Sequence, residues 1–172
     1  EETQKSSDFD GTGTDCTNID CGVVVTVHTS CNPFISTTQV VPKCLTLGMG
    51  CRKDKDARGI AEAAQKVLDR FGFYKEAFEQ IASIDLKKEE KGILSLSQDW
   101  QIPFVTYTEE ELKQVPGEFT PSPFVKKITG VDNVCERSAV LASGNGRLLQ
   151  RKTGENGVTT AVAAREWRIH FE

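Results

Sequence analysis

The 172-residue sequence lacks the signatures of several common enzyme classes. It contains no H-E-x-x-H, G-x-S-x-G or G-x-x-x-x-G-K-S/T pattern, which argues against a zincin, a serine hydrolase and a P-loop enzyme. It has only two histidines, His28 and His170, so the usual partner base of a catalytic cysteine is scarce. Cysteines are present, but their spacings do not form the C-x2-C pairs of a structural zinc site. We therefore expect free, reduced thiols and no protein-bound metal.

An excess of basic residues and a long apolar run are also missing. The sequence has 21 Lys and Arg against 25 Asp and Glu, a net charge of −4, so a nucleic-acid partner is not expected. A local basic pocket for an anionic small molecule is still compatible with this charge. No apolar run approaches the roughly 20 residues of a membrane span, and residues 1–15 lack the apolar core of a signal peptide. We expect a cytoplasmic protein with no membrane partner.

From residue 43 onward, strand-like and helix-like segments alternate. Apolar residues recur at helical spacing from Ile60 to Phe71, which predicts a helix capped by Asp54 and ended by Gly72. Strands are predicted over 43–47, 81–86, 103–107, 147–151 and 157–163, and further helices over 74–80, 92–100, 109–115, from 122–123 onward, and over 134–142. Such alternation forms right-handed β-α-β units, whereas the last two strands lack an intervening helix. The expected fold is therefore α/β, with three α/β/α layers around a mixed, mainly parallel sheet.

Residues 1–42 follow a different pattern. Residues 1–20 are rich in Asp, Thr, Gly and Ser, which is typical of a flexible tail. A β-branched run over 22–27 predicts a buried strand, and 36–41 predicts a shorter one. We interpret 1–42 as a flexible tail plus the remnant of a preceding region, and 43–172 as the α/β domain, with an edge strand at 168–171. Since the chain begins with Glu rather than Met, we expect a fragment or a processed product.

The stretch Leu45-Thr-Leu-Gly-Met-Gly-Cys-Arg-Lys-Asp54 is the first candidate site. It predicts a strand, a tight glycine turn and a helix N-terminus, which together present backbone N–H groups and a helix dipole to an anion. Its candidate ligand-binding residues are Gly48, Gly50, Cys51, Arg52 and Lys53. A turn whose glycines serve geometry alone is an equal alternative, because a lone G-x-G is weak evidence. For Cys51, a small structural thiol is favoured over an activated nucleophile.

The stretch Ser83-Ile-Asp-Leu-Lys87 is the second candidate site. Strand periodicity would place Ser83, Asp85 and Lys87 on one face, where polar groups are costly unless they are used or paired. Asp85 is a candidate general base; orienting Lys87 or capping the next helix are the alternatives. Ligands in open α/β sheets bind beyond the carboxyl ends of the strands, so 48–53, 83–88 and 107–108 are expected to meet, with the loop 117–122 reaching the same rim.

Taken together, five ordered motifs resemble the C-terminal domain of the CbiG/CobE family of cobalamin biosynthesis, in which CbiG is the cobalt-precorrin-5A hydrolase of the anaerobic pathway. The motifs are Leu47-Gly-Met-Gly-Cys-Arg-Lys53, Ala82-Ser-Ile-Asp-Leu-Lys87, Thr120-Pro-Ser-Pro-Phe-Val125, Thr129-Gly-Val-Asp-Asn-Val-Cys-Glu-Arg137 and Gly157-Val-Thr-Thr-Ala-Val-Ala163. The resemblance spans roughly residues 43–165. Residues 22–42 resemble the end of the central region of CbiG, which favours a fragment of a longer CbiG over a stand-alone CobE. The family usually has a small residue, often Gly, at the position of Asp54.

The resemblance implies a cobalt tetrapyrrole substrate that carries many acetate and propionate carboxylates. The cobalt would be carried by the substrate, with no further cofactor, and other cobalamin-pathway enzymes would be partners. The implied reaction opens a δ-lactone and releases acetaldehyde, with Asp85 as general base and Lys87 and Arg52 stabilising negative charge. The implied substrate-binding residues are Gly48, Gly50, Cys51, Arg52, Lys53, Ser83, Phe119 and Ser122, with Phe124 and Met49 completing an apolar wall. The alternatives are a non-catalytic, CobE-like tetrapyrrole-binding or handover domain, and a domain for another anionic metabolite.

Overall fold

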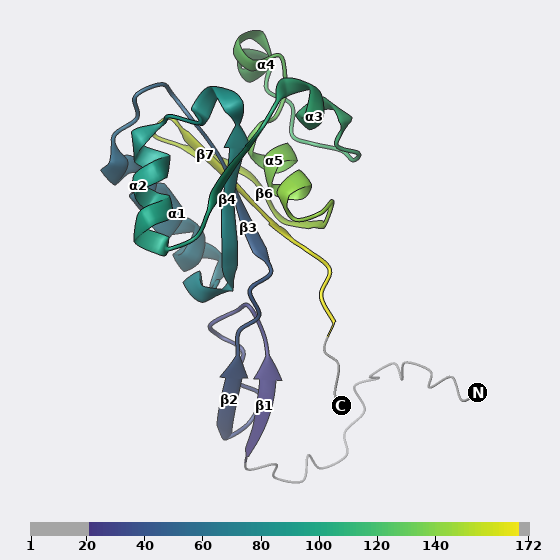
Figure 1. Ribbon diagram of the computed structural model, residues 1–172. Helices are drawn as coiled ribbons and strands as arrows, with labels where there is room; N and C mark the ends of the chain where they lie inside the picture. The colour runs from purple at the N-terminus through teal and green to yellow at the C-terminus, as the bar shows by residue number, and fades with distance from the viewer. Residues whose placement is uncertain (1–20, 169–172) are drawn as a thin grey trace, which may run out of the picture.

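A five-stranded mixed β-sheet forms the centre of the computed structural model, which describes residues 21–168 (Figure 1). The strands lie in the order β5-β4-β3-β7-β6, with the bounds β3 Leu45–Cys51, β4 Phe78–Ile84, β5 Phe104–Tyr107, β6 Arg147–Glu155 and β7 Val158–Ala164. β3, β4 and β5 are parallel, whereas β7 is antiparallel to both β3 and β6. The mixed sheet and its antiparallel closing pair confirm the predicted fold class.

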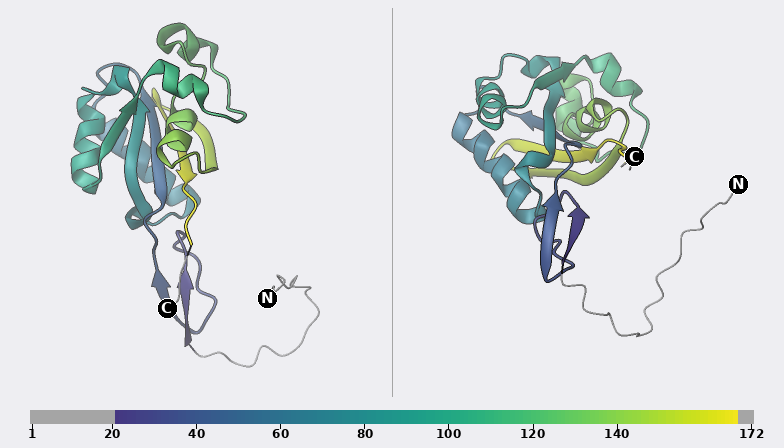
Figure 2. Two further views of the ribbon diagram at one scale, coloured as in Figure 1. Left: turned by 45° about the vertical axis from the view of Figure 1, so that its right-hand side comes forward. Right: turned by 60° about the horizontal axis from the view of Figure 1, so that its bottom comes forward.

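Helices cover both faces of the sheet, which gives the three layers seen in Figures 1 and 2. α1 (Ala57–Phe71) and α2 (Lys91–Trp100) pack on one face, against β7 and β5 respectively. α5 (Cys135–Ala142) packs on the other face against β3, β4 and β7, with α3 (Glu109–Gln114) beside it. α4 (Pro123–Thr129) lies beyond the end of the sheet at which β4 finishes. Within residues 21–168, no helix combines the length and apolar character that a membrane crossing requires.

Alternation along β3 assigns its residues to the two faces of the sheet. Leu45, Leu47 and Met49 are fully buried in the core beneath α1 and α2. Gly48 faces α5 instead, where a Cβ atom would overlap the carbonyl oxygen of Cys135. The absence of a side chain at Gly48 therefore lets α5 lie directly against the sheet.

The glycine segment is part of this strand rather than the predicted tight turn. β3 continues through Gly48 and Gly50 to Cys51, because β7 pairs with every residue of β3. A turn prediction was wrong here because the strand that extends β3 comes from the far end of the chain. The glycines serve close packing and strand pairing, and the chain turns only after Cys51.

The start of α1 also differs from the prediction. The helix begins at Ala57 and its cap is Asp56, whose carboxylate accepts a hydrogen bond from the N–H of Gly59 at 2.7 Å. Asp54 is therefore not the cap, and its φ of 56° lies in the left-handed region that favours glycine. Gly72 ends the helix in a left-handed conformation, as predicted.

β4 begins and ends earlier than predicted. The predicted helix over 74–80 is only the 3-10 turn η1 (Lys75–Ala77), because Phe78 already pairs with β3. β4 ends at Ile84, and the 3-10 turn η2 (Asp85–Lys87) follows. The predicted strand alternation therefore stops at Ile84, and Ser83 does not share a strand face with the two charged residues after it.

Residues 21–42 form a small sheet apart from the five-stranded one (Figure 1). Its strands β1 (Cys21–Val25) and β2 (Ser36–Val40) are parallel to each other. The N–H of Tyr74 donates to the carbonyl of Val27 at 2.9 Å, which ties this sheet to the α/β core. The predicted tail over 1–20 lies outside the described residues, as does all but the first residue of the predicted edge strand 168–171.

Candidate functional site

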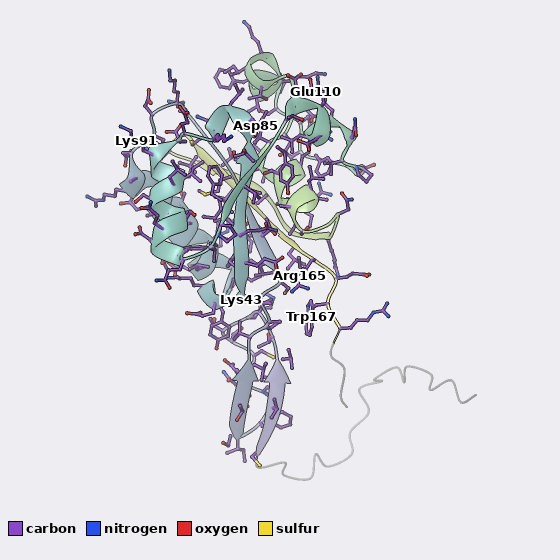
Figure 3. The ribbon with its side chains drawn as sticks, in the orientation of Figure 1. Lys43, Asp85, Lys91, Glu110, Arg165 and Trp167 are labelled. Atoms are coloured by element: carbon purple, nitrogen blue, oxygen red, sulfur yellow. The ribbon has the colours of Figure 1, made fainter. Side chains whose placement is uncertain are left out.

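A cleft of about 1360 Å³ opens at the edge of the sheet where β3 and β4 end. Its walls come from these strand ends, the turn 52–56, η2, the start of α2, helix α4 and the β6–β7 hairpin. The labelled residues Asp85 and Lys91 mark this end of the molecule in Figure 3, opposite Lys43 and Arg165. The cleft thus lies where ligands bind in open α/β sheets. Its volume exceeds the roughly 300–1,000 Å³ of pockets for drug-sized ligands, so it suits a larger one.

Six of the predicted site residues meet in the lining of this cleft. They are Gly50, Cys51, Arg52, Lys53, Lys87 and Ser122, and Phe124 of the predicted apolar wall joins them. The N–H of Arg52 donates to the carbonyl of Gly157 at 3.0 Å, which fixes the turn after β3 against the β6–β7 hairpin. The sequence motifs around residues 50 and 87 are therefore neighbours in space, as their places at the ends of parallel strands indicated.

The other predicted site residues lie outside the lining. Gly48 and Ser83 are buried in the sheet, and the Ser83 hydroxyl donates to the carbonyl of Met49 at 2.7 Å. Asp85 is exposed at the start of η2. The Phe119 ring packs into a core cluster beneath α5, and the guanidinium of Arg137 lies 4.5 Å from its centroid. Ser83 and Gly48 thus support the site by joining and packing its strands.

Charged side chains line the cleft, and cations predominate among those without a partner. Within residues 21–168, Lys55 pairs with Asp56 and Lys87 with Glu90, both at 2.9 Å. The lining side chains that form no ion pair in that range are Arg52, Lys53, Lys91 and Lys152 among the cations and Asp54 and Glu89 among the acids. This excess makes the cleft locally attractive to anions although the whole chain carries a charge of −4.

The two thiols in the lining are neutral. Burial raises the pKa of the Cys51 thiol to about 11, and the nearby Lys87 ammonium offsets only part of this rise. Burial also raises the pKa of the Cys135 thiol to about 12. Both groups are protonated at neutral pH, which supports a small neutral thiol at Cys51 over an activated nucleophile. All five cysteines within residues 21–168 are free thiols.

One side of the cleft opening is apolar. Leu86 in η2 is 66% exposed, and Phe124 and Ile128 on α4 are 69% and 60% exposed. Phe124 and Ile128 are four residues apart on one helix, so they lie on the same side of α4. Exposed large apolar side chains that gather at one opening mark a surface for an apolar partner. The cleft therefore combines unpaired cations with an apolar lip.

A hydrogen-bond network at the start of α5 joins this helix to the segment before α4 and to β6. The Glu136 carboxylate is fully buried and accepts hydrogen bonds from the N–H and hydroxyl of Thr120, both at 2.8 Å, and from the N–H of Lys152 at 2.6 Å. The side-chain amide of Asn133 donates to the carbonyl of Thr120 at 2.9 Å. Glu136 and Asn133 were not predicted as site residues. They lie within the motif over 129–137, but its spacing alone indicates no contact with residue 120.

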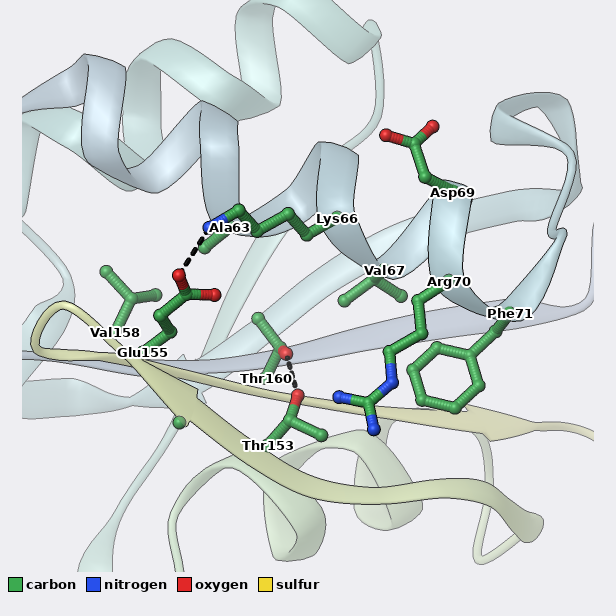
Figure 4. Close-up of a pocket in the computed structure, with 11 residues that line it drawn as sticks. Ala63, Lys66, Val67, Asp69, Arg70, Phe71, Thr153, Glu155, Val158 and Thr160 are labelled. Carbon is green, nitrogen blue, oxygen red and sulfur yellow. Dashed lines mark hydrogen bonds and ion pairs between the residues drawn. The ribbon is translucent and has the colours of Figure 1, made fainter.

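A second pocket, of about 380 Å³, lies between α1 and the β6–β7 hairpin (Figure 4). Lys66 on its wall pairs with Glu155, and the Arg70 guanidinium lies 5.6 Å from the centroid of the Phe71 ring. Its cations are thus already engaged, whereas four cations of the larger cleft form no ion pair within residues 21–168. The larger cleft is therefore the better candidate site.

Comparison with known proteins relates the chain to cobalamin biosynthesis. Residues 45–163 match the family described as Cobalamin synthesis G C-terminus. The chain is 34% identical over 122 residues to the cobalt-precorrin-5A hydrolase of Priestia megaterium, and 35% identical over 124 residues to that of Salmonella typhimurium. These matches cover 71% and 72% of this chain but 32% and 35% of the relatives. The chain thus spans about a third of the length of these two hydrolases.

Solved structures share the fold. CobE, a protein from the cobalamin (vitamin B12) biosynthetic pathway, aligns with a TM-score of 0.65 and 29% identity over 72% of this chain and 91% of its own. A putative cobalamin biosynthesis protein G homolog from Sulfolobus solfataricus aligns with a TM-score of 0.60 and 25% identity over 84% of this chain and 44% of its own. The family match covers more than half of the chain and agrees with the motifs and the fold, so the chain belongs to the Cobalamin synthesis G C-terminus family.

Proposed function

We propose that this chain binds a cobalt tetrapyrrole in the large cleft and acts as the C-terminal part of a cobalt-precorrin-5A hydrolase. The observation that carries the proposal is the composition of the cleft, in which cations that form no ion pair within residues 21–168 stand beside an exposed apolar lip. Cobalt belongs to the substrate in this proposal, and no resident cofactor is needed. We also propose a cytoplasmic location, since free thiols suit a reducing compartment.

The two sides of the cleft match the two kinds of surface on such a substrate. Its acetate and propionate groups need cations, which Arg52 and Lys53 supply beside the end of β3 and Lys152 supplies from β6. Its macrocycle needs an apolar surface, which Phe124 and Ile128 supply from α4. Because the cations and the lip share one opening, a flat polycarboxylate can contact both at once.

The proposed reaction begins when water adds to the carbonyl of a δ-lactone on the substrate. The lactone opens to a carboxylate and an alcohol, and a retro-aldol step then releases acetaldehyde. We propose that Lys87 and Arg52 stabilise the negative charge that develops on the carbonyl oxygen, together with the N–H group of Cys51. Their place in the lining supports this assignment.

Asp85 remains our proposed general base. It lies in η2 next to Leu86 and two residues before Lys87, but its own side chain is exposed and outside the lining. If it is the base, replacing Asp85 with Asn should lower turnover by about 10²-fold or more while ligand binding is unchanged. Full turnover by Asp85→Asn would reject the assignment.

A second candidate function is that of a non-catalytic tetrapyrrole-binding or handover domain. One specific observation favours it: CobE, a separate protein, aligns with this chain over 91% of its length. In addition, the chain matches only about a third of the hydrolases named above. Binding and catalysis are therefore tested separately.

The decisive experiment incubates the chain with cobalt-precorrin-5A and follows both the absorption spectrum and the release of acetaldehyde. A spectral shift with acetaldehyde release would support a complete hydrolase site in this chain. A shift without acetaldehyde would support the binding domain. The absence of any shift would refute tetrapyrrole binding and favour another anionic metabolite as ligand.

A further inference from the structure

Glu90 is a buried carboxylate that lines the cleft and was not predicted as a site residue. It precedes α2, and its side chain is only 7% exposed. Its Oε1 accepts a hydrogen bond from the N–H of Lys55 at 3.1 Å, and its Oε2 accepts one from the Lys87 ammonium at 2.9 Å. Lys87 itself is only 14% exposed. Glu90 thus joins the turn after β3 to the lysine that follows β4.

A stabilising role alone explains this arrangement poorly. Burying an ion pair carries a desolvation penalty that often offsets the attraction between the charges. Glu90 is at the N-cap position of α2 but makes no side-chain capping bond there. Its carboxylate is turned instead toward Lys55 and Lys87, which both line the cleft.

Lys87 also differs from the other cations of the cleft. Arg52 and Lys53 form no ion pair within the described part of the chain, so an incoming anion can draw them into place. Lys87 is held before any ligand arrives, and its charge partly offsets the rise that burial causes in the pKa of the Cys51 thiol. A cation fixed in advance loses less entropy when it meets its ligand.

We infer that Glu90 is the positioning residue of this site, which holds the Lys87 ammonium in the cleft where β3 and β4 end. This inference rests on the proposed function, because the anion that Lys87 would meet is a carboxylate or the developing oxyanion of the tetrapyrrole. Both Glu90 oxygens are already engaged, so Glu90 acts through Lys87 and not on the substrate itself.

The test compares Glu90→Gln with Glu89→Gln, using uroporphyrin III, a tetrapyrrole with acetate and propionate groups, as the probe. Both variants remove one negative charge from the lining, but Glu89 is exposed and forms no ion pair with Lys87. Charge removal alone would tighten binding in both. If Glu90 positions Lys87, Glu90→Gln should bind at least about fivefold more weakly than Glu89→Gln, and Lys87→Met should abolish that difference. Equal affinity of the two variants would overturn the inference.

A readout without any ligand separates this inference from the proposed function. The alkylation rate of Cys51 by iodoacetamide, measured by mass spectrometry, reports on the nearby ammonium; exposed Cys21 is the internal reference. Lys87→Met should slow Cys51 alkylation severalfold in the wild-type background and have little effect in the Glu90→Gln background. An equal slowing in both backgrounds would show that Lys87 keeps its place without Glu90. Wild-type protein that binds neither uroporphyrin III nor cobalt-precorrin-5A but gives the expected alkylation pattern would refute the proposed function and leave the positioning role intact.

Discussion

Two buried carboxylates, Glu136 and Glu90, are satisfied in different ways. Glu136 lies in the α5 layer and accepts bonds from neutral donors of Thr120 and Lys152. Glu90 lies beside the cleft and accepts one N–H and one ammonium group. Glu136 is outside the cleft lining and reaches it only through the backbone N–H of Lys152, whereas Glu90 is part of that lining.

This difference separates a region built for stability from one built for binding. Around Glu136, the donors of Thr120 and Lys152 are matched with its carboxylate. At the cleft, several charged side chains form no ion pair within residues 21–168 and apolar side chains stay exposed, which is unfavourable for folding and useful when a ligand covers them. The following substitutions test how far the two regions are distinct.

The largest effect is expected from Glu136→Ala, which leaves the two donors of Thr120 and the N–H of Lys152 without an acceptor. Each unsatisfied buried donor costs about 1–3 kcal/mol, so the free energy of unfolding should fall by about 3 kcal/mol or more. Urea denaturation measures this, with exposed Glu110→Ala as control. The free energy of unfolding should fall clearly less for Glu90→Ala, because water in the cleft can solvate the Lys87 ammonium. Equal losses at Glu136 and Glu90 would break the distinction between the two regions.

A smaller loss of stability is expected from Gly48→Ala. The added methyl group would overlap the carbonyl oxygen of Cys135, so α5 must move, and such overpacking costs about 1–3 kcal/mol. Gly50→Ala is the matched control, since its Cβ would lie 2.7 Å from the Thr159 hydroxyl, which can rotate away. Thermal unfolding should show a clear decrease for the first variant and a slight one for the second. The reverse order would mean that β3 is packed more tightly at its end beside the cleft than at Gly48.

Much of the fold followed from local patterns in the sequence. The apolar period from Ile60 to Phe71 and the glycine at position 72 predicted α1, and the helix predicted over 109–115 is α3, which begins with a capping box of Thr108 and Glu111. The place of the cleft followed from the rule for open sheets. These features depend on neighbouring residues or on a general rule of topology, so a sequence suffices.

The failures have a common physical cause, which is pairing between distant segments. β7 holds Gly48 and Gly50 in a strand where local reasoning predicts a turn, and pairing with β3 makes the last three residues of the predicted helix 74–80 part of β4. The network of Glu136 with Thr120 joins residues of separate motifs. No local pattern reports such contacts. For the same reason, the prediction of Phe119 as part of the apolar wall did not anticipate that this ring packs under Arg137, outside the cleft lining.

Arg52→Ala tests whether the cations of the cleft bind the ligand. Loss of one charge-assisted hydrogen bond costs about 1.5 kcal/mol or more, so uroporphyrin III binding should weaken about tenfold, with little change in unfolding. Arg58→Ala is the control, because Arg58 is on α1, pairs with Glu62 and is outside the lining. Titration at low and high salt should show the larger difference at low salt. If both variants lose affinity equally, the attraction comes from overall charge and not from the cleft.

The apolar lip should contribute less than the cations. Phe124→Ala removes a ring that is 69% exposed, so the free protein should keep its stability. Covering part of that ring by a macrocycle is worth on the order of 1 kcal/mol, which predicts roughly fivefold weaker binding. Ile35→Ala, which removes an apolar side chain that is 77% exposed and outside the cleft lining, should not change binding. Unchanged affinity of Phe124→Ala would show that the ligand does not reach α4.

The smallest effect is expected at Asp54, where folding and binding requirements coincide. Asp54 has a φ of 56° and lines the cleft without an ion pair within residues 21–168. Asp54→Gly should relieve the backbone and raise the free energy of unfolding by about 0.5 kcal/mol, and removing the charge should tighten uroporphyrin III binding about twofold to threefold. Asp54→Asn separates the two effects, because Asn tolerates the same backbone conformation and carries no charge. It should therefore reproduce the gain in binding without the gain in stability. If Asp54→Gly binds more tightly and Asp54→Asn does not, backbone strain and not charge limits the affinity at this position.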